Sequence, residues 1–305
     1  MSRIQFNDDD DPVDIRFDNV FKAVFTRNNP VSQGALSKLV SALIGKEVTV
    51  TSINANEPPV DNLNDRQIRF DINCRAENGE LINVEMSLNP EYYEPVRLEF
   101  HAGKLFTGQD IRGQNKSYND LKQAYQITIL GKDKFFTDKA FFHTFAYYDS
   151  ENMISLNGRS RIITLELSKI GKLIEKPVKG RSSRENWAVY FQFLTDRSKR
   201  RKINEILEAE EGIAMASEVL LNISRDEIER ARLFSEEKYQ LDRQSELTWA
   251  RKKGLQEGEL KGEKKGREAI ARKALAKGAS MDFVQEITGF TAEEIKKLQT
   301  GRKSK

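Results

Sequence analysis

Residues 69–87 read RFDINCRAENGELINVEMS, two runs of alternating apolar and polar residues on either side of Glu77, Asn78 and Gly79. This alternation predicts a β-hairpin. A three-residue loop with Gly79 in the left-handed conformation, which glycine adopts without strain, places Asp71 opposite Glu85. One face of the hairpin is then apolar: Phe70, Ile72, Cys74, Ala76, Ile82, Val84 and Met86. The other is polar: Arg69, Asp71, Asn73, Arg75, Asn83, Glu85 and Ser87.

The turn could instead use two residues, Asn78 and Gly79, which is also a common hairpin turn. That choice shifts the pairing by one residue and puts Asp71 and Glu85 on opposite faces. We favour the three-residue loop because it keeps the apolar face free of polar side chains.

Two carboxylates at directly opposed positions lie about 4.5–5.5 Å apart at Cβ and repel each other unless a cation lies between them. A hard divalent ion such as Mg²⁺, or else Mn²⁺ or Ca²⁺, takes oxygen ligands of this kind. Such an ion activates water for hydrolysis of a phosphodiester. The alternative reading of the spacing alone is a solvated sheet face on which Arg69 and Arg75 pair with the acids.

Upstream of the hairpin, apolar residues between Phe17 and Phe25 recur at helical spacing, and a second such stretch runs from Leu36 to Gly45. VTVTSI at 48–53 then predicts a strand. Downstream, RSRIITLEL at 159–167 predicts a further strand and WAVYFQFL at 187–194 begins a helical region in which SRDE at 224–227 matches a capping box. The aromatic residues Tyr118, Tyr125 and those of 141–148 are interpreted as core and sheet packing rather than base-stacking platforms.

The composition is that of a polar globular protein: 305 residues, 32% charged and 38% hydrophobic, with a net charge of only +3. This length accommodates two structural units. Because the net charge is small, a nucleic-acid-binding surface has to be local.

The single cysteine, Cys74, excludes an internal disulfide and a thiolate zinc cluster, and the histidines His101 and His143 are too few for a His-rich metal site. The acidic amino terminus and the lack of a long apolar segment favour a cytoplasmic protein without a membrane span.

The C-terminal region is strongly charged. Residues 251–277 contain ten Lys or Arg and four Glu, and glycines recur every fourth residue from Gly254 to Gly266. Since glycine weakens a helix, this piece is expected to be a loose linker or a close helix contact. Residues 270–298 predict three short helices ending in a small helix-turn-helix-like unit, with Ser280 and Thr291 as caps and Glu294 completing a capping box. The tail is expected either to contact DNA or to form a homo-oligomer.

The hairpin, with Asp71 followed fourteen residues later by Glu85 in INVEMS, resembles the catalytic hairpin of PD-(D/E)XK nucleases. More narrowly, the chain resembles the recombination-promoting nuclease (Rpn) and transposase-like branch. RFDNVFKAVF at 16–25 is similar to the opening helix of that branch. The stretch from Arg97 through Gly113 to LKQAYQITIL at 121–130 is similar to the segment after its hairpin, and ITGFTAEEIKKL at 287–298 is similar to its ending.

The resemblance implies an α/β fold with a restriction-endonuclease-like mixed sheet flanked by helices and followed by an α-helical tail. We expect a nuclease-like core over 1–195, a helical extension over 196–250 and the charged tail over 251–305. The resemblance further implies that Asp71 and Glu85 bind the metal and that the residue two positions after the glutamate completes the site. That residue is Ser87, where the superfamily usually has lysine and this branch commonly has glutamine.

Other residues are candidates for completing the site. Lys104 is the best placed to replace the missing lysine, unless it is a solvated helix position, and Gln109 is a polar substitute. Asp18 either assists the metal or caps the first helix. Arg97 either holds a phosphate or pairs with Glu94 or Glu99. His101 is expected to have a structural role.

The leading functional expectation is a divalent-metal-dependent DNA endonuclease linked to recombination or mobile elements. The alternative is a DNA-binding or assembly protein that keeps the fold and has lost the chemistry at Ser87. Nothing in the sequence favours a phosphatase-like hydrolase of small nucleotides.

Overall fold

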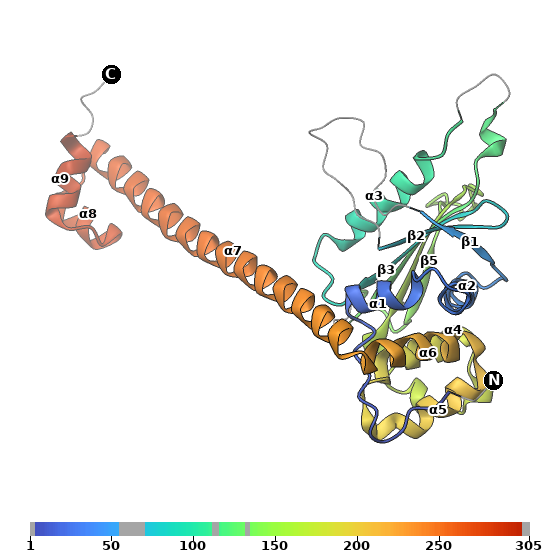
Figure 1. Cartoon of the computed structure of the whole chain (residues 1–305). Helices are drawn as coiled ribbons and strands as arrows, with labels where there is room; N and C mark the ends of the chain where they lie inside the picture. Colours follow the sequence, from blue (N-terminus) through green and yellow to red (C-terminus); the bar gives the residue numbers. More distant parts are fainter. Residues whose placement is uncertain (1–3, 55–70, 112–115, 132–134, 301–305) are drawn as a thin grey trace. The chain divides into compact units, whose positions relative to one another are not determined.

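The computed structural model describes residues 4–54, 71–111, 116–131 and 135–300 (Figure 1). Arg69, Phe70 and Gly113, which entered the sequence-based expectations, lie outside these residues. The chain divides into two compact units, Met1–Glu237 and Lys238–Lys305. The sequence-based boundaries near residue 195, between core and extension, and near residue 250, between extension and tail, describe which parts fold independently. They stay a prediction.

A mixed six-stranded sheet lies at the centre of the first unit, in the order β1-β2-β3-β4-β6-β5 (Figure 1). The pairs β1/β2, β2/β3 and β6/β5 are antiparallel, whereas β3/β4 and β4/β6 are parallel. The strands are β1 (Val50–Ile53), β2 (Ile72–Ala76), β3 (Leu81–Ser87), β4 (Ala124–Leu130), β5 (Phe142–Phe145) and β6 (Ser160–Glu166). A mixed sheet flanked by helices is the fold that the resemblance implies, so the expected fold class is confirmed.

One face of this sheet packs against most of the helices of the unit. The apolar side chains of β2, β3, β4 and β6 on this face form a single core cluster with those of the helices, and the cluster continues to Leu233. The helices concerned are α1 (Asp18–Phe25), α2 (Pro30–Ile44), α4 (Ser183–Phe193), α5 (Arg200–Ala209) and α6 (Glu211–Arg225). Short 3-10 helices connect the elements: η1 (Tyr118–Asp120), η2 (Leu167–Lys169), η3 (Leu173–Glu175), η4 (Val178–Gly180) and η5 (Arg197–Lys199). The opposite face carries polar residues and is covered by α3 (Glu94–Thr107).

Local signals explain the ends of the first helices. Asn29 caps α2 by accepting a hydrogen bond from the Ser32 backbone N–H, and Gly45 ends the helix at φ 83°, a conformation that glycine adopts readily. The predicted order of two helices and a strand is therefore confirmed. The capping reading of Asp18 is wrong, because the N-cap of α1 is Phe17 and no side chain caps the helix.

The expected capping box at SRDE is also wrong. Ser224 is buried within α6, where its hydroxyl donates to the Leu220 carbonyl oxygen at 2.7 Å. Asp226 accepts from the Glu229 backbone N–H instead, at 2.9 Å, and α7 (Glu227–Ala276) starts directly after it. Tertiary burial of the serine thus moves the cap by two residues.

The second unit contains most of α7 followed by α8 (Met281–Thr288) and α9 (Ala292–Thr300). Ala271, Val284, Phe290 and Ile295 form its small core. The predicted caps are confirmed: Ser280 accepts from the Phe283 backbone N–H at 3.3 Å. The Thr291 backbone N–H donates to Glu294 at 2.8 Å, and the Thr291 hydroxyl oxygen accepts from the Glu294 backbone N–H at 3.3 Å.

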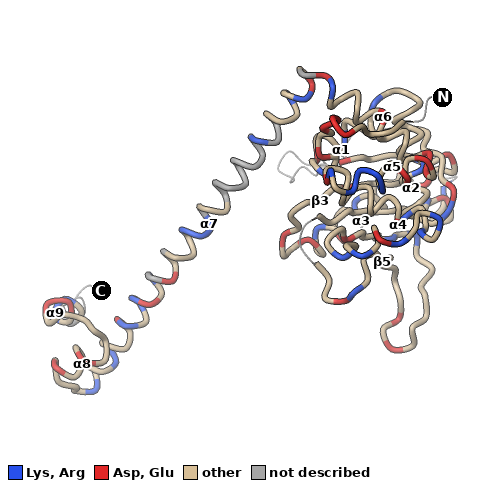
Figure 2. The backbone as a smooth tube through the Cα atoms, turned by 90° about the horizontal axis from the view of Figure 1, so that it is seen from below, with Lys and Arg blue, Asp and Glu red and all other residues tan. Residues whose placement is uncertain are grey.

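The four evenly spaced glycines do not form a loose linker, so that expectation is wrong, while the alternative of a close helix contact stays a prediction. They lie within the continuous helix α7, and a methyl group added at any of the four would meet no described atom within 4 Å apart from the neighbouring backbone of the helix itself. Charged residues of both signs alternate with them along this helix, as the blue and red segments of the backbone tube in Figure 2 show. Helix formers such as Lys, Glu and Leu between the glycines compensate for their low propensity. Among the described residues, no helix combines the length and the apolar content needed to cross a membrane.

Several aromatic side chains expected in the core are exposed. Phe145, Tyr147, Tyr148 and Tyr118 retain 41%, 54%, 55% and 79% of their accessible surface, so the core-packing interpretation is wrong for these four. For Phe145, Tyr147 and Tyr148 the reason is topological. β5 forms the edge of the sheet, and the chain continues beyond it into a hairpin closed by the Tyr148–Ser155 bridge, where no layer of described residues covers these rings.

Candidate active site

The β2–β3 hairpin positions the two acidic residues. Its loop consists of Glu77, Asn78 and Gly79, with Gly79 at φ 85° and its N–H donating to the Ala76 carbonyl oxygen at 2.8 Å. Ile72 pairs with Val84 and Asn73 with Asn83. Continuing this register by one residue puts Asp71 opposite Glu85, so the three-residue loop is confirmed and the two-residue turn is wrong.

The polar face of the hairpin is buried at Asn83 and Glu85, partly buried at Asp71 and Asn73, and exposed at Arg75. Glu85 is 1% exposed and its carboxylate Oε1 lies 2.7 Å from His101 Nδ1 and accepts from Asn83 Nδ2 at 3.0 Å. Arg97 NH2 lies 3.4 Å from the other oxygen, Oε2. Burial alone would raise the pKa of Glu85, but the His101 hydrogen bond and the Arg97 charge outweigh it and hold that pKa below its usual range. Glu85 is therefore a carboxylate at neutral pH.

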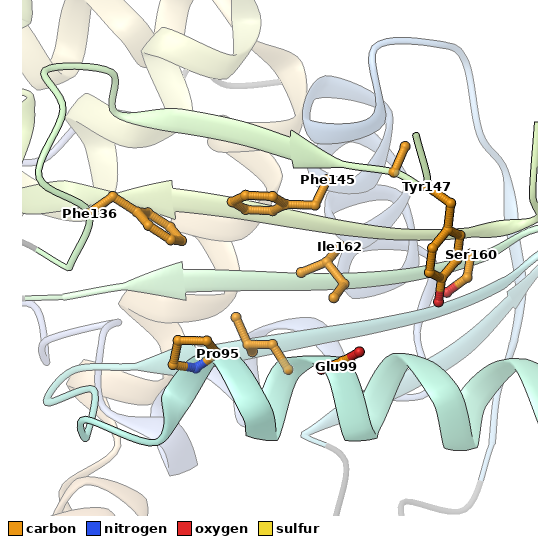
Figure 3. A pocket seen from close by; sticks show the side chains of 9 residues that line it. Pro95, Glu99, Phe136, Phe145, Tyr147, Ser160 and Ile162 are labelled. Atoms are coloured by element: carbon orange, nitrogen blue, oxygen red, sulfur yellow. The ribbon is translucent and has the colours of Figure 1, made fainter. Parts of the chain in front are cut away.

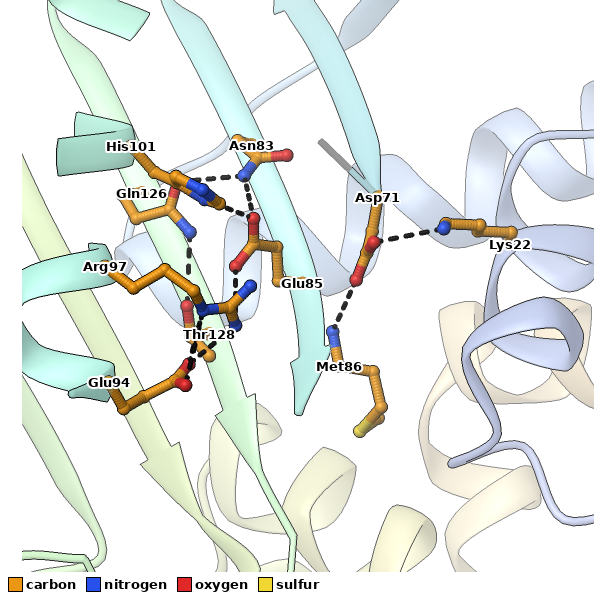
Figure 4. Close-up of polar contacts among 10 residues, drawn as sticks. All are labelled: Lys22, Asp71, Asn83, Glu85, Met86, Glu94, Arg97, His101, Gln126 and Thr128. Carbon is orange, nitrogen blue, oxygen red and sulfur yellow. Dashed lines mark hydrogen bonds and ion pairs between the residues drawn. The ribbon is translucent and has the colours of Figure 1, made fainter. Parts of the chain in front are cut away.

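A chain of hydrogen bonds holds the partners of Glu85 in place. Arg97 NH2 donates to Glu94, itself 2% exposed, at 2.6 Å. Asn83 Nδ2 also donates to Gln126 Oε1 at 2.8 Å, and Gln126 in turn donates to Thr128 at 3.2 Å (Figure 4). These contacts link β3, β4 and α3. A buried polar network with most partners satisfied restrains the position of Glu85.

Asp71 lies in a different environment. Its Oδ2 accepts from the Met86 backbone N–H at 3.3 Å, and its Oδ1 lies 3.0 Å from the ammonium group of Lys22 on α1. The same ammonium group donates to Asp18 at 2.8 Å. Burial and the nearby negative charge of Asp18 raise the pKa of Asp71 to about 7 in spite of Lys22, and the charge of Glu85 contributes to the rise. A bare carboxylate is thus unfavourable at position 71.

The structure brings together only some of the candidate residues. Lys22 links Asp18 to Asp71, and Arg97 and His101 both contact Glu85, so the candidates fall into two separate clusters on neighbouring strands. The carboxylate of Glu85 points toward α3, whereas that of Asp71 points toward Lys22 (Figure 4). Arg97 contacts both Glu94 and Glu85, so the ion-pair reading of this residue is confirmed.

The remaining candidates, Lys104, Gln109 and Ser87, make no contact with Asp71 or Glu85 that the structure shows among the described residues. Lys104 is exposed, with its ammonium group 5.9 Å from the ring of Phe100 on α3. Gln109 bonds the backbone of Lys122, accepting from its N–H at 2.7 Å and donating to its carbonyl at 3.0 Å. Ser87 ends β3 opposite Leu130 and is half-buried, on the face of Glu85 by strand alternation.

Two observations bear on a metal ion. Glu85 Oε2 is buried and accepts no hydrogen bond within the described part of the chain, and the Asp71 carboxylate is disfavoured as an isolated charge. A cation would relieve both conditions, so these residues fit one. Within the described residues, no cluster of three or more His, Cys, Asp or Glu side chains has metal-binding geometry. Water and substrate oxygen atoms are further ligands that Mg²⁺ commonly uses.

The comparison with protein families decides the classification. The model of the PD-(D/E)XK nuclease family transposases matches residues 15–250, which extend from the start of α1 into α7. The chain belongs to this family. No curated protein and no solved structure matches the chain significantly. PD-(D/E)XK family membership supports a nuclease-type enzyme, a class that typically uses divalent metal ions and for which DNA is the expected substrate.

The sequence also contained signals for the partners of the two acids. Lys22 lies four positions after Asp18, the spacing at which side chains meet on a helix. His101 lies four positions after Arg97 and so shares the face of α3 that reaches Glu85. His101 is buried, which agrees with the structural role expected for it, but the residue that it contacts is Glu85. Alternation places Asn83 on the correct face, although it does not reveal the hydrogen bond to Glu85.

Proposed function

We propose that this protein is a metal-dependent DNA endonuclease whose centre is Asp71 and Glu85. The observation that carries the proposal is the pair of unequal carboxylates on one hairpin, Glu85 held ionised by His101 and Arg97 and Asp71 held in a site that disfavours its charge. Perturbed acids of this kind concentrate at functional sites.

The residues present suit distinct tasks. Asp71 and Glu85 Oε2, which lies 3.4 Å from Arg97 NH2, would hold a divalent cation, which supplies Lewis acidity and an activated water when bound. His101 and Asn83 fix the orientation of Glu85. Arg97, whose side chain is 34% exposed, lies at the border of the site and is able to meet a phosphate.

Lys22 is our candidate for the positive charge that the motif lacks at Ser87. Its ammonium group lies between Asp18 and Asp71, and it would stay bound to Asp18 after leaving Asp71. A lysine in that position stabilises negative charge developing on a phosphate. Lys104 remains the alternative source, although its ammonium group lies near Phe100 on α3.

The second candidate function is a DNA-binding or assembly protein without catalysis. It is favoured by the ion pair between Lys22 and Asp71, which already neutralises the carboxylate that the metal needs. We assign the basic stretch of α7 to phosphate-backbone contact or to a homo-oligomer, in recombination or mobile-element biology. Such charge clusters release counterions on binding DNA.

Incubation of supercoiled plasmid with the full chain and Mg²⁺, Mn²⁺ or Ca²⁺ tests the choice. Nicked or linear product that EDTA suppresses, and that Asp71→Asn and Glu85→Gln both lack, supports the endonuclease. Absence of cleavage with every metal, together with retained DNA binding, supports the second candidate.

A further inference from the structure

A pocket lies beside the candidate active site, on the same face of the sheet. Side chains from α3 form one wall and side chains from β5, β6 and their flanking segments form the other (Figure 3). Its volume is about 250 Å³. It is lined by Pro95, Leu98, Glu99, Phe136, Phe145, Ala146, Tyr147, Ser160 and Ile162. Pockets for drug-sized ligands start at roughly 300 Å³, so this one suits a smaller group such as a single ring system.

Aromatic rings dominate the walls. Phe136 and Phe145 lie 5.4 Å apart between ring centroids, and Phe145 and Tyr147 keep 41% and 54% of their surface exposed. Large apolar side chains left open around a concave surface mark binding sites. The arrangement therefore presents flat π surfaces to whatever enters.

The wall at Phe136 is fixed before any ligand binds. The backbone N–H groups of Phe135 and Phe136 donate to Glu166 Oε2 at 2.7 Å and 3.3 Å. Glu166 is fully buried and pairs with Lys169 at 2.6 Å. A preformed pocket binds without paying for the ordering of its own side chains.

Polar groups are few and lie among the lining residues. Glu99 supplies a carboxylate, Ser160 a hydroxyl and Tyr147 a phenol. A carboxylate accepts hydrogen bonds from exocyclic amino groups of bases, as it does from cytosine N4. Aromatic walls with an acceptor among them fit an amino-bearing nucleobase better than an aliphatic side chain.

The sheet register sets the separation between this pocket and the acidic residues. Ile162, a pocket residue on β6, pairs with Gln126 on β4. Gln126 in turn pairs with Asn83 on β3, and Asn83 lies two residues before Glu85 on the same strand. With strands spaced 4.7–4.9 Å apart and about 3.3 Å per residue, the pocket lies roughly 10–12 Å from Glu85. A DNA strand spans that distance in a few nucleotides. Both sites also share α3, which contributes Arg97 and His101 to one and Leu98 and Glu99 to the other.

We propose that this pocket binds one unstacked base of the strand whose phosphate lies at Asp71 and Glu85, so that single-stranded or mismatched DNA is the preferred substrate. The proposal rests on the proposed DNA endonuclease function and names its substrate class. A mispaired or single-stranded base is the least costly to move out of a stack, which gives the selectivity its physical basis.

The chain provides a matched pair of variants. Tyr147 and Tyr148 are adjacent and almost equally exposed, at 54% and 55%, but only Tyr147 lines the pocket. Binding of the full chain is measured in EDTA, where no cleavage is expected, to single-stranded oligonucleotides carrying 2-aminopurine at one position, to the same strands with an abasic site there, and to intact duplex. The probe loses fluorescence when it stacks on an aromatic ring.

We expect the parent to prefer single strands to duplex, to quench the probe, and to bind the abasic strand less tightly. Tyr147→Ala should weaken binding roughly 5- to 100-fold, the range for loss of one base-stacking partner, and remove the quenching. Tyr148→Ala should do neither, and all variants should keep the melting temperature of the parent.

Equal effects of Tyr147→Ala and Tyr148→Ala, or equal affinity for duplex and single strand, would overturn the base pocket. A fall in molar mass by light scattering with Tyr147→Ala would overturn it too, because a second copy of the chain would then occupy the pocket. Cleavage assays distinguish the two proposals. If binding depends on Tyr147 but the protein does not cleave DNA, only the endonuclease proposal is contradicted. If the protein cleaves DNA and Tyr147→Ala does not change this cleavage, only the base-pocket proposal is contradicted.

Discussion

The ammonium group of Lys22 lies 3.0 Å from the carboxylate of Asp71, in a chain whose motif has Ser87 at the place where a lysine is usual in its superfamily. The lysine comes from α1, about fifty residues upstream of the hairpin. Burial lowers the pKa of Lys22, but Asp71 and Asp18 outweigh burial and raise it above its ordinary value. Lys22 therefore stays charged and competes with any cation for Asp71.

Replacing Asp71 by asparagine should abolish cleavage yet stabilise the metal-free protein. The pKa of Asp71 is about 7 when folded and close to 3.8 when unfolded, so the folded state binds the extra proton between these values. The free energy of unfolding of the parent therefore falls as pH rises from about 4 to about 7. Asp71→Asn should raise the melting temperature at pH 8 in EDTA, by roughly 2–4 °C per kcal/mol gained. The gain should vanish at pH 4, and a variant less stable than the parent at pH 8 would contradict the assignment.

Glu85→Gln should have the opposite effect on stability and the same effect on cleavage. The pKa of Glu85 is lowered, so its contribution is present above the unfolded pKa near 4.5 and is lost as pH falls through the folded pKa. Loss of its charge-assisted hydrogen bonds to His101 and Asn83 should cost about 1.5–3 kcal/mol at pH 7. Urea denaturation at pH 7 and pH 3.5 measures this cost, which should shrink at the lower pH.

Lys22→Gln should tighten divalent-metal binding and slow cleavage. Without the ammonium group, Asp71 is open to the cation, but a positive charge near the phosphate is lost. Loss of one preorganised group of this kind typically costs 10²–10³-fold in turnover. Calorimetric titration with Ca²⁺ and initial cleavage rates with Mg²⁺ report the two effects separately.

Lys104→Gln is the matched control for Lys22. Lys104 is exposed on α3 near Phe100, so its replacement should leave both metal affinity and cleavage within about twofold of the parent. A large loss with Lys104→Gln and none with Lys22→Gln would reverse the assignment and restore Lys104 as the substitute for the missing lysine.

Removing residues from about 250 onward should leave the first unit folded while changing DNA binding or assembly. The core cluster ends at Leu233, and the second unit has its own small core, so the truncated protein should keep its melting temperature. If the basic residues of α7 meet phosphates, the affinity for DNA should depend less steeply on salt. If the tail instead holds a homo-oligomer together, the truncation should lower the molar mass measured by light scattering. The salt dependence of DNA affinity per subunit should then stay unchanged. An unchanged mass, affinity and slope would remove both roles.

The sequence alone determined the features that depend on local rules. Alternation in residues 69–87 and a glycine at the left-handed position set the hairpin register, because a shift of one residue would have buried the polar set in the core. Gly45 and the pair of Thr291 and Glu294 likewise marked their helix ends, since caps depend on residues within one turn. Family resemblance added the fold class and the identity of the two acidic residues.

Only the tertiary structure decided the environment of those acids. Alternation placed Glu85 on a polar face, but the covering of that face by α3, with His101 and Arg97, depends on contacts between separate elements. Lys22 reaches Asp71 across about fifty residues of sequence, and the exposure of Tyr147 results from the edge position of β5. Local patterns specify which side of a strand a residue occupies; the groups that lie against that side are set by packing of distant segments, and that packing determines the charge state of each carboxylate.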